Sequence, residues 1–124
     1  MKKSQPEKQI ENAILDYLLM VDGMFWKAQN VGIYDPRKGT FRRPGKYHKA
    51  GVADILGIIR GRFVAIEVKT KTGRLSKSQA KFLDEVRLNG GIAFVARSVE
   101  ECDEQLRSYF PKRTSTSKIH RPKL

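Results

Sequence analysis

The sequence predicts an α/β protein: a small mixed β-sheet flanked by helices. An amphipathic stretch near the start is followed by two apolar runs around a tight turn, and then by segments in strand–helix–strand order. Apolar runs separated by a short turn are typical of an antiparallel hairpin. A helix between two strands of one sheet is typical of a parallel pair joined by a crossover. A sheet with both kinds of pair is mixed, and helices cover it.

The first half of the chain predicts one helix, one strand and a long loop. Apolar residues at helical spacing predict a helix over residues 6–21, which Asp22-Gly23 ends. Residues 24–30 form a candidate strand. Residues 32–51 form a basic loop rich in Gly and Pro, with aromatic residues among its cations. Loops this long in compact domains are usually functional or mobile.

The second half begins with the hairpin, whose strands lie on either side of Arg60-Gly61-Arg62. A helix begins near Ser76, and Gly90-Gly91 stops it. The apolar residues 92–97 do not alternate with polar ones, which predicts a strand covered on both faces and parallel to one hairpin strand. A last helix spans residues 99–110, with the preceding serine as its cap.

The length of 124 residues allows one domain with a modest core. We expect residues 1–110 to form it, and residues 111–124, which lack periodicity, to form a flexible basic tail. The lone Cys102 excludes an internal disulfide and indicates a reducing compartment. No apolar run approaches the length of a membrane span. The sequence therefore predicts a soluble, intracellular protein.

The positive charge is concentrated in two segments. The formal net charge is +12, and residues 36–53 and 111–124 hold six and five basic residues with no acid, which accounts for +11 of it. Such a distribution favours a polyanionic partner, most simply nucleic acid, over a merely solubilising surface.

Two acids and a lysine lie at the open end of the predicted hairpin. A loop at Arg60-Gly61 places Asp54 opposite Glu67, and a loop at Gly61-Arg62 places it opposite Lys69. Either loop gathers the three side chains on one face, because side chains alternate along a strand. Converging carboxylates can hold a hard divalent cation such as Mg²⁺, as in a metal-dependent phosphodiesterase. The structural alternative is an ordinary ion pair on a solvated edge strand.

Four motifs in a fixed order resemble a known nuclease family. They are a glutamate in the first helix, Gly51-x-x-Asp54, Glu67-x-Lys69 and a helix that opens Leu75-Ser76-x-x-Gln79. This order resembles the VRR-NUC family of the PD-(D/E)XK nuclease superfamily, and the short chain is similar to its stand-alone, phage-type members. The resemblance covers about residues 7–109. It implies a restriction-endonuclease-like core and, for a phage protein, the cytoplasm of a bacterial host.

The resemblance also implies roles for these residues. Asp54 and Glu67 would bind Mg²⁺ or Mn²⁺, and the carbonyl of Val68 would add a further ligand. Lys69 would lie beside the attacking water and the scissile phosphate, where an ammonium group offsets developing negative charge.

Two further catalytic candidates, Gln79 and Glu7, have alternative explanations. Gln79 supports the site in the resemblance, but Ser76-x-x-Gln79 is also a capping box. Glu7 fits the spacing of the first-helix glutamate and continues the apolar stripe, although Ser4-x-x-Glu7 is another capping pattern. We favour Glu7 over Glu11, which lies one turn further along.

The predicted DNA contacts are Arg42, Arg43, Lys46 and Lys49 of the basic loop, with Tyr34 and Tyr47 available to stack on unpaired bases or to pack against the core. The resemblance implies structure-selective cleavage of branched DNA, notably Holliday (four-way) junctions, by a homodimer. The alternatives are a monomeric flap or single-strand nuclease and a non-catalytic DNA-binding module with a nuclease fold. A basic RNA-associated protein would explain the charge but not the acidic hairpin.

Overall fold

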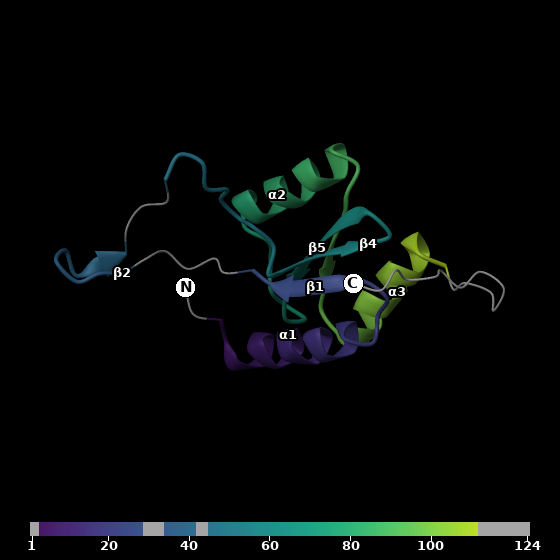
Figure 1. Ribbon diagram of the computed structural model, residues 1–124. Coiled ribbons are helices and arrows are strands. Elements are labelled where there is room, and N and C mark those ends of the chain that lie inside the picture. The colour runs from purple at the N-terminus through teal and green to yellow at the C-terminus, as the bar shows by residue number, and fades with distance from the viewer. Residues whose placement is uncertain (1–2, 29–33, 42–44, 112–124) are drawn as a thin grey trace, which may run out of the picture.

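The structure of the chain is a computed structural model that describes residues 3–28, 34–41 and 45–111. Along these residues the elements follow in the order α1 (Gln5–Leu18), β1 (Met24–Lys27), β2 (Tyr34–Asp35), β3 (Thr40–Phe41), β4 (Ile55–Ile59), β5 (Arg62–Val68), α2 (Lys77–Leu88), β6 (Ile92–Ala96) and α3 (Val99–Tyr109). One mixed sheet has the strand order β1-β4-β5-β6, and β2 pairs with β3 separately. Helix α2 covers one face of the larger sheet, and α1 and α3 lie against the other (Figure 1). The predicted α/β fold is confirmed.

The hairpin has the first of the two predicted registers. Ile55 pairs with Ile66, and the loop consists of Arg60 and Gly61, whose φ angles are 49° and 81°. Positive φ at both loop positions is the geometry of a type I′ turn, whose twist matches that of the strands. One step beyond Ile55, the register places Asp54 opposite Glu67.

The sheet separates two apolar cores because successive residues of β5 point to opposite faces. Ile66 and Val68 pack with α1 and α3, whereas Ala65 packs with Leu83 of α2. Strand β6 runs parallel to β5 after the α2 crossover, which confirms the predicted parallel pair. Within the described ranges no helix has the length and apolar character that crossing a membrane requires.

The start of each of the last two helices is also confirmed. Ser76 and Gln79 form a complete capping box at the start of α2. At the start of α3, the hydroxyl of Ser98 accepts a hydrogen bond from the N–H of Glu101 at 3.1 Å.

The end of α1 and the content of the long loop differ from the prediction. Helix α1 ends at Leu18 rather than Val21, because the chain tightens there: the N–H groups of Met20 and Val21 donate to carbonyls three residues earlier. Val21 still packs against the core, which is why it continued the apolar stripe. The segment predicted as one loop, 32–51, contains the short β2–β3 hairpin.

Candidate active site

Three predicted site residues meet where the β4–β5 hairpin opens. Asp54 directly precedes β4, Glu67 is the second-last residue of β5, and Lys69 follows that strand. Only 5%, 1% and 9% of their respective surfaces are exposed. This burial, on a strand in the middle of the sheet, contradicts the alternative of an ion pair on a solvated edge strand.

Gly51 lets the chain reach this position. Its φ is +71°, and a Cβ atom there would lie 2.2 Å from the carbonyl carbon and oxygen of Ser78. Only glycine allows the backbone to cross so close to the first turn of α2. The crossing leads through the buried Ala53 to Asp54 at the hairpin opening.

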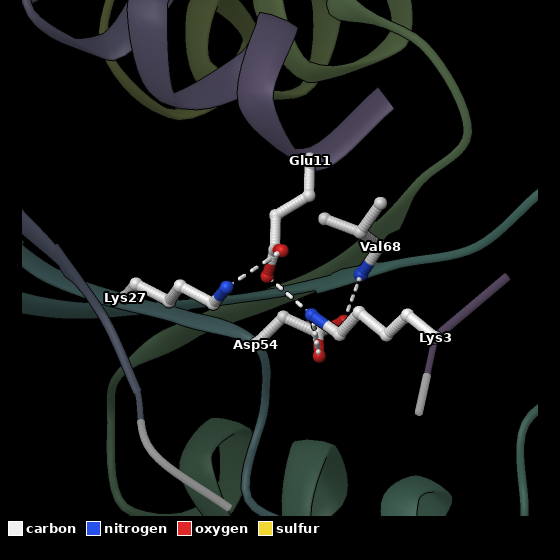
Figure 2. Close-up of polar contacts among 5 residues, drawn as sticks. All are labelled: Lys3, Glu11, Lys27, Asp54 and Val68. Atoms are coloured by element: carbon white, nitrogen blue, oxygen red, sulfur yellow. Dashed lines mark hydrogen bonds and ion pairs between the residues drawn. The ribbon is translucent and has the colours of Figure 1, made fainter. Parts of the chain in front are cut away.

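The side chain of Asp54 accepts a hydrogen bond from the backbone of β5, as the carbonyl of a neighbouring strand would. Its Oδ2 accepts a hydrogen bond from the N–H of Val68 at 2.8 Å (Figure 2). Its own carbonyl accepts one from Ala28 at 2.8 Å. The N–H and C=O of a strand residue point to the same side. The Val68 carbonyl is therefore directed toward the opening that holds the Asp54 carboxylate.

A third carboxylate enters from α1. Glu11 is fully buried on the same helical stripe as Ile14 and Leu18. Lys3 bridges it to Asp54: the Lys3 ammonium hydrogen-bonds Oε1 of Glu11 and lies 2.8 Å from Oδ1 of Asp54 (Figure 2).

Glu11 also pairs with Lys27 of β1, whose ammonium lies 3.4 Å from Oε2. Neither Lys3 nor Lys27 was predicted from the sequence as a site residue. Their contacts join segments that no local spacing relates, so the sequence carries no signal for them.

The structure brings Glu11, rather than the favoured Glu7, to the Asp54 side of the site. Glu7 is partly exposed in the first turn of α1, where its N–H donates to the Ser4 hydroxyl at 3.3 Å. Glu11, one turn further along, is the residue that reaches the Asp54 side of the site. Glu11, not Glu7, lies on the buried stripe of α1 with Ile14 and Leu18.

The buried carboxyl groups of Asp54 and Glu67 shift each other's pKa. Burial, together with the hydrogen bond to Asp54 and its negative charge, raises the pKa of Glu67 to about 9, although the charge of Lys69 opposes the rise. Burial also acts against ionisation of Asp54, but hydrogen bonds from Glu67, Lys3 and the Val68 N–H outweigh it and lower the pKa of Asp54. The second oxygen of Glu67, Oε2, is buried without a hydrogen-bond partner.

Gln79 has the capping role that its spacing allows. Its Oε1 accepts a hydrogen bond from the N–H of Ser76 at 2.9 Å, and its own N–H donates to the Ser76 hydroxyl at 3.1 Å. Because Gly51 crosses the same helical turn, Gln79 lies beside the segment that leads to Asp54.

The described part of the basic loop is exposed. Lys46 lies over the ring of Tyr47, 5.0 Å from its centroid, and Tyr47 is 87% exposed rather than packed against the core. The ammonium of Lys49 pairs with Glu85 of α2 at 2.7 Å. Arg42 and Arg43 lie outside the described residues, as does the tail from residue 112 onward.

The residues at the hairpin opening fit a divalent cation. Within the described ranges no three His, Cys, Asp or Glu side chains form a cluster able to hold a metal ion by themselves. Mg²⁺, however, usually binds one or two carboxylates and keeps several waters. Asp54 and Glu67 supply two carboxylates, and a cation would give the buried Glu67 Oε2 the partner it lacks.

Comparisons with known proteins agree with this fold. The model of the VRR-NUC domain matches residues 5–100. None of the curated proteins matches. Among solved structures, one described as a "VRR_NUC domain protein" is similar with a TM-score of 0.63 and 16% identity, over 88% of this chain and 91% of that chain. An identity this low shows likeness of fold alone, but the family match extends over most of the sequence. The chain therefore belongs to the VRR-NUC family and has a nuclease-type fold.

Proposed function

We propose that the protein is a Mg²⁺- or Mn²⁺-dependent endonuclease that hydrolyses phosphodiester bonds in DNA at the Asp54–Glu67–Lys69 site. The observation that carries the proposal is the buried pair of carboxylates with one unpartnered oxygen, next to a buried lysine, in a chain of the VRR-NUC family. Burying such groups is costly unless they are paired or bind a metal, so their presence at one end of an apolar hairpin favours a functional role.

Asp54, Glu67 and the Val68 carbonyl would hold the metal ion. Once bound, a metal of this kind lowers the pKa of a bound water and stabilises negative charge on the phosphate. Hydrogen bonds from Val68 and Lys3 already fix the orientation of the Asp54 carboxylate. Glu67 must release its proton to act as a ligand. Glu11 would lie near Asp54 and bind further cations or waters.

Lys69 would act directly on the reacting phosphate. Its ammonium group donates hydrogen bonds to the attacking water and to a non-bridging oxygen, where it offsets the charge that develops as water attacks phosphorus. A buried lysine has lost much of its competing water, so this interaction is stronger than it would be at the surface.

The ammonium group of Lys3 supplies positive charge next to the Asp54 carboxylate, where the metal would bind. Its ammonium group contacts both Glu11 and Asp54, and those contacts raise the pKa of Lys3 in spite of the burial that opposes its charge. Because one ammonium group cannot share the Asp54 oxygens with a metal without repulsion, we expect Lys3 to leave Asp54 when the metal binds.

The proposed substrate is branched DNA, notably the four-way junction, cut by a homodimer. The high positive charge supports a DNA partner, and no recognition-helix motif or zinc finger is visible that would read sequence. A dimer would supply one site for each of two strands. Lys46 and Lys49 on the exposed loop are the proposed phosphate contacts, together with Arg42 and Arg43.

Cleavage of labelled junction, flap and linear duplex in Mg²⁺, Mn²⁺ or EDTA tests the proposal. Paired nicks on the junction that require a metal, and that Glu67→Gln abolishes, are the expected result. Glu104→Gln is the matched control, because Glu104 is exposed on α3 and the charge change is the same. If the protein cut the flap in preference to the junction, the proposed activity would be flap cleavage rather than junction resolution. Tight binding without cutting in either metal would make the protein a DNA-binding module.

A further inference from the structure

The turn that follows Lys69 packs against that residue. The N–H of Lys69 donates to the Ala96 carbonyl of β6 at 3.2 Å, and the N–H of Gly73 closes the turn on the Thr70 carbonyl at 3.1 Å. A Cβ atom on Gly73 would lie 3.4 Å from Cδ of Lys69. Gly73 of the turn therefore lies next to the aliphatic stem that carries the Lys69 ammonium.

Arg97 holds this turn from the neighbouring strand. Its Nη1 donates to the carbonyls of Thr70 at 2.6 Å and Gly73 at 2.7 Å, with a longer contact to Lys71 at 3.4 Å. Both ends of the turn are thus bound by one guanidinium group.

The backbone of Arg97 is itself anchored. Its N–H donates to a carboxylate oxygen of Glu101 at 3.1 Å, and the next residue, Ser98, caps α3. The hydrogen-bond network thus joins the turn to the junction between β6 and α3, where regular structure holds Arg97 on both sides. A residue fixed in this way can transmit that rigidity to the turn.

We propose that Arg97 is a positioning residue for Lys69. By holding the 70–73 turn against the lysine stem, it keeps the ammonium group at one place beside Glu67. The catalytic consequence rests on the proposed nuclease function, but the placement of Lys69 can be measured without any cleavage.

Chemical labelling measures that placement directly. Lysines of the metal-free protein are acylated for short times, and the rate at Lys69 is read by mass spectrometry against the exposed Lys71. In the wild type, Lys69 reacts slowly because it is buried. Arg97→Ala should raise its rate several-fold. An unchanged rate at Lys69 in a folded Arg97→Ala protein would overturn the proposal.

Arg87→Ala is the matched control. Like Arg97, Arg87 donates to a backbone carbonyl, here that of Ala93 in β6 at 3.0 Å, but its other partner is Asp84 and it does not contact the turn. Its loss should leave the Lys69 rate unchanged. If Arg97→Ala does not fold, Arg97→Lys keeps the charge with a shorter reach, and Lys69 should then react faster than in the wild type; an unchanged rate would overturn the proposal.

Kinetics separate positioning from DNA contact. A misplacement of about 1 Å costs ~100-fold in rate, so Arg97→Ala should lower kcat by between about tenfold and ~100-fold with KM for DNA unchanged. A raised KM with kcat unchanged would instead make Arg97 a phosphate contact and overturn the proposal. A wild type without cleavage would refute the proposed function, while the labelling would still decide whether Arg97 positions Lys69.

Discussion

At the scale of single residues, the site is a set of charges that neutralise one another without metal. The raised pKa of Glu67 favours its protonated form beside Asp54, and Lys3 joins Asp54 to Glu11. If a divalent cation binds as proposed, the proton of Glu67 and the ammonium group of Lys3 would have to leave.

The raised pKa of Glu67 predicts how stability depends on pH in EDTA. Between its ordinary pKa of 4.5 and the folded value of about 9, the folded protein holds a proton that the unfolded chain has released. This group therefore makes the free energy of unfolding decrease as pH rises through that window. Urea unfolding at several pH values checks it. Glu67→Gln, which cannot ionise, should flatten the slope, and an equally steep slope in that variant would contradict the assignment.

Replacing Lys3 predicts opposite effects with and without metal. Lys3→Ala should lower stability in EDTA, because Asp54 and Glu11 lose their shared cation, and tighten Mg²⁺ or Mn²⁺ binding by about tenfold or more, since charged hydrogen bonds contribute ~1.5–3 kcal/mol. Thermal unfolding and calorimetric titration measure the two effects. Lys8→Ala, an exposed change on α1, is the control. Weaker metal binding in Lys3→Ala would show that Lys3 supports the site rather than competing for it.

The sequence predicts the site residues of the hairpin better than the residues that reach the site from other segments. Asp54, Glu67 and Lys69 follow from alternation along strands, which is a local rule. The choice between Glu7 and Glu11 depends on how far along the sheet α1 begins, and that is set by packing between distant segments. Lys3 contacts the site from outside any regular element, so no periodicity could identify it.

At the scale of elements, α2 and the segment before β4 hold each other in place. The backbone at Gly51 crosses the first turn of α2, whose capping box fixes Ser76 and Gln79. The positions of these elements could be predicted from turn and cap residues. Their contact could not, because it joins a loop to a helix more than twenty residues away.

Gly51→Ala should therefore be strongly destabilising. A positive φ alone costs an L-residue about 1–2 kcal/mol, and here a methyl group would also overlap the Ser78 backbone. The matched control is Gly90→Ala, where φ is +86° but no atom lies within 4 Å of the added carbon. Urea unfolding of both variants separates backbone strain from overlap. Equal losses of stability would contradict the close crossing.

At the scale of the whole molecule, the fold separates the proposed catalytic residues from the proposed DNA contacts. The site is buried at the hairpin opening, whereas the cations of the described basic loop are exposed. The net charge of +12 predicts a polyanionic partner, but composition alone gives neither the path that a bound DNA would take nor a surface for a dimer. Both depend on which residues lie together on the surface, and the sequence alone does not give this.

DNA binding should accordingly be steeply salt-dependent. Each phosphate contact contributes about one unit to the slope of log Kd against log salt concentration, so Lys46→Ala should lower that slope by about 1 and weaken binding alike for all DNA sequences. Fluorescence anisotropy in EDTA measures it without cleavage. Lys8→Ala should leave the slope unchanged. An unchanged slope in Lys46→Ala would show that Lys46 does not contact a DNA phosphate.

The central claim is that the buried cluster at the hairpin opening performs chemistry rather than binding DNA. Its most direct test compares Lys69→Ala with Lys71→Ala, two residues further along, which removes the same charge from an exposed position. Single-turnover cleavage of the junction in Mn²⁺ and the Kd for the same junction in EDTA are measured for both proteins. We predict that Lys69→Ala loses at least ~100-fold in rate with Kd unchanged, whereas Lys71→Ala cleaves like the wild type. Equal rates in the two variants, or a loss of DNA binding in Lys69→Ala that accounts for the loss of cleavage, would contradict the account.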